Sequence, residues 1–143
     1  MTMVRNTRQR EAIRATLVAE GRPLSVSELL KLAHTRVTSI GIATVYRNLK
    51  ILQAEKQVVQ VDLPGGAPRW EIVPEEHHHH FLCRTCNRLF EIHNCPADLQ
   101  GLLPSGYTLE EHDILLRGIC GDCSADINSK VKDHEHVSDE DRD

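Results

Sequence analysis

The sequence has few aromatic residues, no long apolar run and no apolar leader. Phe, Trp and Tyr together make up 3% of the 143 residues, and 40% of the chain is hydrophobic. Such a chain has little material for a self-sufficient core, so a metal cross-link and dimerisation would be natural supplements. No segment approaches the ~20 apolar residues of a membrane span. We therefore expect one soluble, cytoplasmic domain, or two very small ones, without a membrane partner.

Acidic residues are scarce in the first part of the chain and abundant in the rest. Residues 1–60 contain ten Lys and Arg against four Asp and Glu, whereas residues 61–143 contain seven against seventeen. The formal net charge of −4 therefore hides a basic and an acidic half. This asymmetry predicts a nucleic-acid-binding module joined to a part with another role.

The five cysteines are too regularly spaced to be incidental. Two Cys-x-x-Cys pairs, Cys83/Cys86 and Cys120/Cys123, are separated by 33 residues. Four thiolates in two pairs form a closed tetrahedral site for structural Zn²⁺. Disulfides are disfavoured because an odd number leaves one cysteine unpaired. Cys95 is that odd residue, and we expect it to be a plain buried thiol, with a supporting or redox role as the alternative.

Four consecutive histidines, His77 to His80, precede the first cysteine pair. They lie inside the chain, whereas purification tags lie at its ends. On a strand, alternate side chains point to opposite faces, which separates His78 and His80 from His77 and His79. The run therefore predicts ligands for metal beyond the cysteine site.

The first half has the pattern of three helices followed by a β-hairpin. Helical spacing starts after Thr7 and stops at Gly21, and a capping box spans residues 25–28. A third helix is expected at about residues 41–55. The strands 58–61 and 69–73 then flank a Pro- and Gly-rich turn. This order predicts a winged helix, a helix-turn-helix variant whose last helix enters the DNA major groove.

The second half predicts a small α/β unit. We expect one strand over residues 81–92, a short helix over 96–103 and a strand over 107–119. The whole chain is thus α+β. The predicted units are a winged-helix domain at 1–74 with its hinge at about 62–76, a dimerisation and metal-binding domain at 77–128, and a disordered acidic tail at 129–143.

Three sequence motifs, in this order, resemble the ferric uptake regulator (Fur) family. They are Thr7-Arg8-Gln9-Arg10, the segment from Gly41 to Leu49, and the segment from His77 to Cys86. The resemblance runs from about Arg5 to Cys123. It implies a homodimeric, metal-dependent repressor that binds a double-stranded DNA operator, with a sensed metal at the hinge between its DNA-binding and dimerisation domains.

The resemblance also implies residue roles. It assigns the structural zinc to the four paired cysteines. The regulatory hinge site would be formed by Glu71, His78, His80 and Glu91, with Asp62 as an alternative to Glu71. A further site would be formed by His77, His79, Asp98 and His112. For each carboxylate, and for His112, simple exposure to solvent is the competing interpretation.

One departure from the family concerns the DNA-binding half. Many iron- and peroxide-sensing members have a hinge histidine where this chain has Pro23, which cannot bind metal. His34 could substitute, although it lies about three turns further on. Asp62 resembles the hinge aspartate of zinc-sensing members, but Val73 lies near the place of their hinge cysteine. The pattern favours Zn²⁺ as the sensed ion, with Fe²⁺ or Mn²⁺ as alternatives.

For DNA, the resemblance places Tyr46 and Arg47 in the major groove and Arg5 in an adjacent narrow minor groove. Lys50 would contact phosphate. A dimer of such arms requires a palindromic operator, here expected to be A·T-rich.

Two other functional classes compete with the repressor. A zinc metalloenzyme would leave the basic winged helix unexplained, and no nucleophile or acid–base set is evident. A metal-storage module would need the histidines but not the helix-turn-helix. We therefore expect neither an enzyme nor a small organic substrate.

Overall fold

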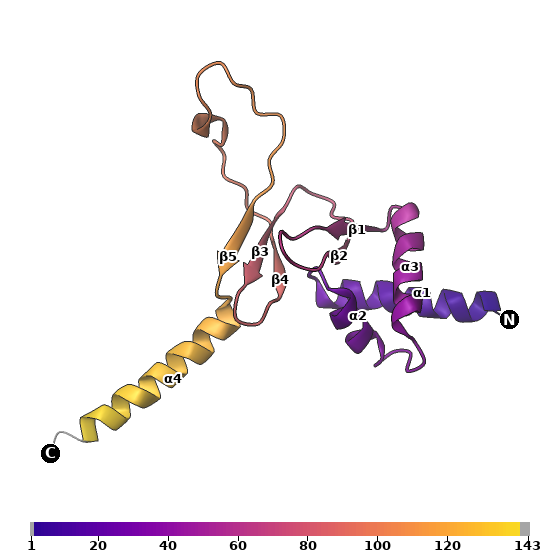
Figure 1. Cartoon of the computed structure of the whole chain (residues 1–143), viewed down its shortest axis with the longest axis horizontal. Helices are drawn as coiled ribbons and strands as arrows, with labels where there is room; N and C mark the ends of the chain where they lie inside the picture. Colours follow the sequence, from indigo (N-terminus) through magenta and orange to yellow (C-terminus); the bar gives the residue numbers. More distant parts are fainter. Residues whose placement is uncertain (1, 141–143) are drawn as a thin grey trace.

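The computed structural model describes residues 2–140, with side chains from residue 7 to residue 130. It has an α+β fold with a helical N-terminal part and a β-rich C-terminal part (Figure 1). The elements, in chain order, are α1 (Thr2–Glu20), α2 (Val26–Ala33), α3 (Ile42–Ala54), β1 (Val58–Val61), β2 (Arg69–Ile72), β3 (His79–Cys83), β4 (Leu89–Ile92), the 3-10 helix η1 (Gln100–Leu102), β5 (Leu115–Gly118) and α4 (Gly121–Glu140).

Local sequence signals set the limits of the first helices. Gly21 has φ +63°, a left-handed conformation that suits glycine, and its N–H donates to the carbonyl of Leu17 at 3.2 Å. The side chain of Ser25 accepts from the N–H of Glu28 at 3.1 Å, and the N–H of Ser25 donates to the Glu28 carboxylate at 3.2 Å. These two bonds form the predicted capping box and fix the start of α2.

Among the described residues, the main hydrophobic core lies in the N-terminal part. Buried side chains of α1, α2 and α3 pack with Val58 of β1 and Trp70 of β2. Leu24 and Trp70 exchange two backbone hydrogen bonds of 2.8 Å, which attach the α1–α2 connection to the β1–β2 hairpin. The three helices and the hairpin therefore form one packed winged helix.

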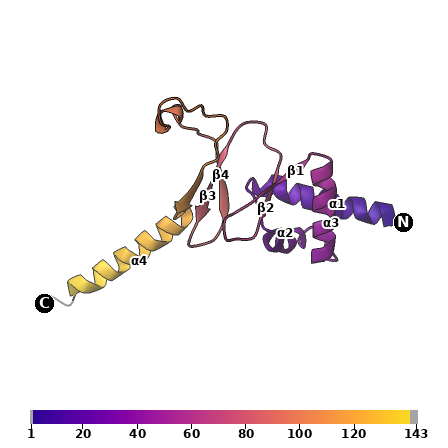
Figure 2. The same ribbon diagram turned by 45° about the horizontal axis from the view of Figure 1, so that its top comes forward.

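The C-terminal sheet has the strand order β4-β3-β5. β3 pairs with β4 as an antiparallel hairpin and with β5 in parallel. A parallel connection needs a long excursion. Here residues 93–114, termed the β4–β5 loop, extend away from the sheet and return (Figures 1 and 2). Among the described residues after β2, only Cys83 and Leu89 have hydrophobic side chains that are fully buried.

The second half differs in detail from the sequence-based expectation. The single strand expected over residues 81–92 is a hairpin, because Asn87 has φ +61° and its N–H bonds to the carbonyl of Cys83, which reverses the chain. The helix expected at 96–103 is reduced to the single turn η1, and the strand expected at 107–119 is only β5. The spacing of apolar residues predicted more helix and strand in this loop than it has, because the loop makes few contacts with the sheet.

α4 begins at the second cysteine pair and extends away from the sheet (Figure 1). Its backbone is helical to Glu140, so it covers residues 129–140, for which sequence analysis predicted disorder. Composition did not reveal that the N-terminus of this helix is anchored, and an anchored first turn removes the cost of nucleation. Residues 141–143 of the predicted tail lie outside the described part. Within that part, no helix is long and apolar enough to cross a membrane.

Candidate metal centres and nucleic-acid interface

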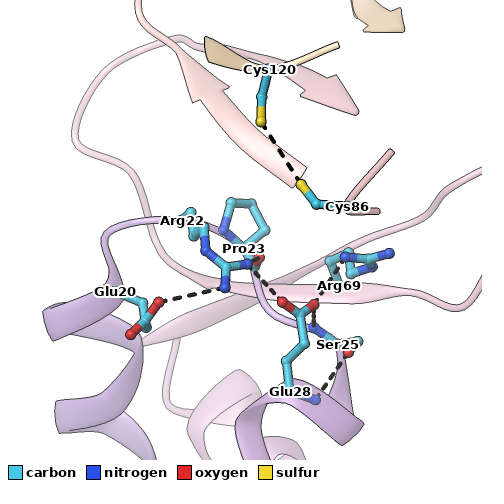
Figure 3. A network of polar contacts seen from close by, with 8 residues as sticks. All are labelled: Glu20, Arg22, Pro23, Ser25, Glu28, Arg69, Cys86 and Cys120. Atoms are coloured by element: carbon cyan, nitrogen blue, oxygen red, sulfur yellow. Dashed lines mark hydrogen bonds and ion pairs between the residues drawn. The ribbon is translucent and has the colours of Figure 1, made fainter. Parts of the chain in front are cut away.

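The four paired cysteines converge between the β3–β4 turn and the start of α4. Their sulfur atoms all lie within 4.8 Å of one another, and the Cys86 and Cys120 sulfurs are 3.9 Å apart (Figure 3). A tetrahedral Zn²⁺ with bonds of about 2.3 Å to sulfur places its ligands about 3.8 Å apart. The donor set and the spacing therefore fit a closed zinc site, which we term the cysteine cage.

Backbone N–H groups prepare this cage for negative charge. Cys83 accepts from the N–H of Cys86 at 3.5 Å and from the N–H of Cys120 at 3.3 Å. The first of these contacts has the largest effect and, although burial opposes it, the pKa of Cys83 falls to about 6. The contact with the Cys120 thiol, followed by burial, raises the pKa of Cys123 to about 12. One thiolate is thus stabilised at neutral pH, and metal binding would release the other protons.

A second cluster, the hinge cluster, consists of Glu71, His78 and His80. Glu71 lies on β2 of the winged helix, and its side chain is 3% exposed. Its two carboxylate oxygens lie 2.9 Å from Nε2 of His78 and 3.3 Å from Nε2 of His80. One ligand from the winged helix and two from the segment leading into the C-terminal sheet therefore face one another across the hinge.

Glu91 of β4 lies beside the hinge cluster, opposite His80 in the β3–β4 register. Burial, a hydrogen bond to Glu71 and the negative charge of Glu71 raise the pKa of Glu91. The pKa of Glu71 is lowered, because the hydrogen bonds from His80 and Glu91 and the charges of both histidines outweigh the opposing effect of burial. Of the two carboxyl groups, Glu71 is thus the one that ionises more readily.

The third cluster joins the two ends of the β4–β5 loop to the segment leading into β3. It contains His77, His79, His112 and Cys95, and we term it the loop cluster. Nε2 of His77 lies 3.0 Å from Nε2 of His79 and 3.1 Å from Nε2 of His112. The Cys95 sulfur lies 3.2 Å from Nε2 of His79 and 3.1 Å from Nε2 of His112.

Two residues of this region differ from the expectation. Asp98, predicted as the fourth member of this group, accepts the N–H of Gly101 at 3.0 Å and is not brought to the three histidines. Cys95, predicted as a plain buried thiol, is exposed and takes that place. The prediction of burial was wrong because Cys95 lies just outside β4, at the surface end of the loop. No local sequence pattern links it to His112, which lies 17 residues further along the chain.

The outer face of α3 carries the residues predicted to read DNA. Tyr46 is 47% exposed, and Arg47 is exposed with its guanidinium 3.2 Å from the Thr44 hydroxyl. Lys50 is also exposed, although its amine lies 5.6 Å from the Trp70 ring centroid. These side chains are free to enter a major groove. The side chain of Arg5, the predicted minor-groove contact, lies outside the described part, since only its backbone in α1 is described.

Comparisons with known proteins agree with this architecture. The sequence profile of the ferric uptake regulator family matches residues 2–117. The chain belongs to this family. It is therefore a metal-responsive transcriptional regulator and not an enzyme.

Individual Fur-family proteins also match this chain over most of its length. The ferric uptake regulation protein of Campylobacter jejuni is 32% identical over 132 residues, which cover 88% of this chain and 82% of that protein. The peroxide operon regulator of Bacillus subtilis is 26% identical, with 89% of each chain covered. The solved structure of the Helicobacter pylori ferric uptake regulator is 26% identical, with a TM-score of 0.61 over 81% of this chain and 79% of that one.

Several predicted hinge ligands of this Fur-family chain lie elsewhere. Asp62 is exposed and accepts a hydrogen bond from Gln60 at 2.8 Å. Nε2 of His34 lies 2.7 Å from the carbonyl of Ile40, so that ring is engaged in the α2–α3 connection. His93 was not predicted, yet its Nε2 lies 3.6 Å from the Glu91 carboxylate. Its position directly after β4 could have suggested it.

A hollow of about 400 Å³ lies at the same hinge. Residues of α1, β2 and the following linker line it, together with Glu91 and His93. The hollow gives access to the acidic side of the hinge cluster, so His93 could approach a bound ion from there.

An ion-pair network supports the hinge from the winged-helix side (Figure 3). The Glu28 carboxylate lies 2.8 Å from Arg22 and 3.0 Å from Arg69. Pro23, at the place of the family's hinge histidine, is fully buried beside this network. Arg69 and Glu71 are two residues apart on β2 and therefore share a face. The network thus fixes the strand that presents Glu71 to the histidines.

Proposed function

We propose that this Fur-family chain is a metal-responsive repressor of metal homeostasis that acts as a homodimer. In this proposal it binds a palindromic, A·T-rich operator when the hinge cluster holds a metal ion, with Zn²⁺ as the favoured ion. The observation that carries it is the buried Glu71 carboxylate of the winged helix, held between His78 and His80 of the C-terminal part.

The geometry supports a mechanism based on restricting the hinge. Glu71 and the two histidines are linked by contacts of 2.9 and 3.3 Å. Coordination through the same three residues would replace these bonds by stronger, more directional ones. A ligand shifts an equilibrium only by its differential affinity for the two states. Only a hinge arrangement that keeps Glu71 beside the histidines offers all three ligands, so metal selects that arrangement of the DNA-binding arms.

The ligand count favours zinc. Glu71, His78 and His80 supply three nitrogen and oxygen donors, and Glu91, which is hydrogen-bonded to Glu71, could supply the fourth. Three or four such donors suit tetrahedral Zn²⁺, whereas Fe²⁺ and Mn²⁺ in comparable sites use more. The cysteine cage would hold a separate, structural Zn²⁺, and the loop cluster a further ion.

An iron- or peroxide-responsive repressor is the second candidate. The observation in its favour is that similar proteins from Campylobacter jejuni and Bacillus subtilis are a ferric uptake regulation protein and a peroxide operon regulator. Against it, the winged helix supplies no hinge histidine, because Pro23 is buried and His34 is engaged.

The test uses protein that retains only the cage zinc. Operator binding is measured by band shift while Zn²⁺, Fe²⁺ or Mn²⁺ is supplied anaerobically at buffered free concentrations. We expect zinc to restore binding at the lowest concentration. Restoration by Fe²⁺ with no response to zinc would select the second candidate.

Glu71→Gln provides the residue-level test, because it keeps the size of the side chain and removes the ligand charge. We expect it to lose the metal response. The matched control is Asp62→Asn, which neutralises an exposed carboxylate outside the hinge cluster and should respond normally. Equal behaviour of the two variants would contradict the role of Glu71.

A further inference from the structure

The loop cluster differs in donor chemistry from the hinge cluster. It offers three imidazole nitrogens and one thiol sulfur, whereas the hinge cluster offers nitrogen and carboxylate oxygen only. A soft thiolate shifts preference toward zinc and softer ions and away from Mn²⁺ and Mg²⁺. The four donors also come from four separate places: the linker before β3, β3 itself, the end of β4 and the approach to β5.

We infer that Cys95 is the fourth ligand of a closed His₃Cys zinc site formed with His77, His79 and His112. This inference deepens the third metal site of the proposed function and rests on it. It concerns the identity and number of the ligands, not the response of the protein to metal at the operator.

The interatomic distances support a four-coordinate site. Tetrahedral Zn²⁺ places two nitrogen ligands about 3.3 Å apart and a nitrogen and a sulfur about 3.5 Å apart, given bonds of about 2.0 and 2.3 Å. Four of the six atom pairs in the cluster lie 3.0 to 3.2 Å apart, and the other two lie within 4.8 Å. Small movements of the side chains would therefore suffice for the four atoms to surround one ion.

The contacts among these donors cannot all be separate two-centre hydrogen bonds, whereas one cation could be bound by all four atoms. Nε2 of His77 faces the Nε2 atoms of both His79 and His112 at 3.0 and 3.1 Å. A neutral imidazole has one N–H and one lone pair, so three ring nitrogens and a thiol that face one another cannot all donate. His79 is 2% exposed, so its ring has a fixed place among these donors.

The contact of His79 with Ile114 is one that metal binding through Nε2 has to change. The Ile114 N–H lies 3.3 Å from Nδ1 of His79, at the long end for a hydrogen bond. An imidazole that binds metal through Nε2 carries its proton on Nδ1. Nδ1 then cannot accept from Ile114, so metal binding must displace this amide.

Four ligands from the protein leave no open position, which is the mark of a structural site. Cys95 and His112 close the two ends of the β4–β5 loop against the His77–His79 segment. Because the loop has little buried apolar surface, we assign to this site the role of holding the base of the loop. Leu102 and Tyr107, which are 78% and 63% exposed, lie on the loop held in this way.

The first test is spectroscopic. Co²⁺ is added to full-length protein whose cysteine cage holds zinc, and the near-ultraviolet thiolate-to-cobalt absorption of wild type and Cys95→Ser is compared. The difference between the two spectra isolates Cys95 even if some Co²⁺ enters the cage. We expect wild type to exceed Cys95→Ser by the absorption of one thiolate. The matched control is Asp98→Asn, which should equal wild type because Asp98 bonds to Gly101 instead.

The second test is affinity, measured by zinc competition with a chromophoric chelator. Structural zinc sites with four ligands have dissociation constants of about 10⁻⁷ to 10⁻¹² M. If the four ligands contribute equally, each accounts for about two to three factors of ten. Loss of one ligand should therefore raise the dissociation constant of this site about a hundredfold in Cys95→Ser. Cys95→Asp, which restores a harder donor, should recover part of the loss and serves as the second variant if Cys95→Ser fails to fold. Zinc should also shift the amide resonance of Ile114 in wild type.

Three results would overturn the inference. They are an unchanged zinc affinity in Cys95→Ser and Cys95→Asp, a loss in Asp98→Asn as large as in Cys95→Ser, or no zinc at His77, His79 and His112 in wild type. The last result would also remove the third metal from the proposed function. The first two would leave metal-dependent operator binding untouched, so the two failures are distinguishable.

Discussion

The ion pair between Glu28 and Arg69 yields the sharpest stability prediction. The Arg69 side chain is only 4% exposed, and its Nε has no hydrogen-bond partner among the described residues. Its ion-pair partner among these residues is Glu28. Arg22 is 11% exposed and also contacts Glu20, at 3.5 Å. Removing the charge of Glu28 therefore leaves a buried guanidinium at Arg69, whereas Arg22 keeps a second carboxylate.

The expected cost of Glu28→Gln follows from this asymmetry. Breaking a buried ion pair by removing one partner costs about 3–5 kcal/mol. Because the Glu28 side chain is 27% exposed, we expect a cost at or below the lower limit of this range, about 2–3 kcal/mol of unfolding free energy. Gln can still accept from the Ser25 N–H, so the capping box survives. Glu28→Ala should cost about 1 kcal/mol more, because it also removes that cap.

Trp70 provides the assay, because it is the only tryptophan in the chain and is 2% exposed in the winged-helix core. Urea unfolding followed by its fluorescence gives the free energy for that part of the molecule. The matched control is Glu20→Gln, which removes a partly exposed partner and should cost about 0–1 kcal/mol. A Glu28→Gln variant as stable as this control would refute the reasoning. In a double-mutant cycle, Glu28→Gln should cost less in an Arg69→Met background.

The remaining predictions concern pH, the cysteine cage and DNA. The pKa of Glu28 lies below its usual 4.5: burial raises it, but hydrogen bonds from Arg22 and Ser25 and the charge of Arg22 outweigh burial. The unfolding free energy of wild type should therefore exceed that of Glu28→Gln by its full amount above pH 4.5, and this difference should shrink as the pH falls further. Cys83→Ser should lose the cage zinc, which metal analysis would detect. With the zinc it should lose on the order of 10 kcal/mol of binding energy that supports the C-terminal fold. An unchanged zinc content would contradict the cage. Arg47→Ala should cost about 1–3 kcal/mol of discrimination between operator and random DNA. Lys50→Ala should instead weaken binding to both DNAs equally and reduce the salt dependence of binding by about one charge. Equal losses of affinity on both DNAs for Arg47→Ala would contradict its role in reading bases.

The sequence predicted the winged helix well because its signals are local. Glycine at a left-handed position, a capping box and helical spacing each act within a few residues, and the structure contains all three. The Arg22–Glu28–Arg69 network was not predicted. Glu28 and Arg69 are 41 residues apart, and no local pattern indicates that two charges so distant will share a buried position.

The second half was predicted less well because its structure depends on long-range contacts. The β4–β5 loop buries few side chains, so its apolar spacing did not correspond to regular elements. For the metal clusters, alternation along the histidine run correctly separated the two pairs, since that rule needs only a strand. The members of each cluster that are not in the histidine run come from other parts of the chain. The sequence therefore did not decide between Glu71 and Asp62 as the hinge carboxylate. It also predicted Asp98 at the position where the structure has Cys95.

The alternation along β3 also means that the hinge and loop clusters are not independent. His78 and His80 face Glu71, while His77 and His79 face Cys95 and His112, and all four histidines are consecutive in one backbone segment. A displacement of this segment that tightens one cluster must therefore move the ligands of the other. If metal at the loop cluster fixes His77 and His79, the histidines of the hinge lose less conformational freedom when they bind metal in turn. Metal at the β4–β5 loop would thereby raise the affinity of the hinge, even though the two sites share no ligand.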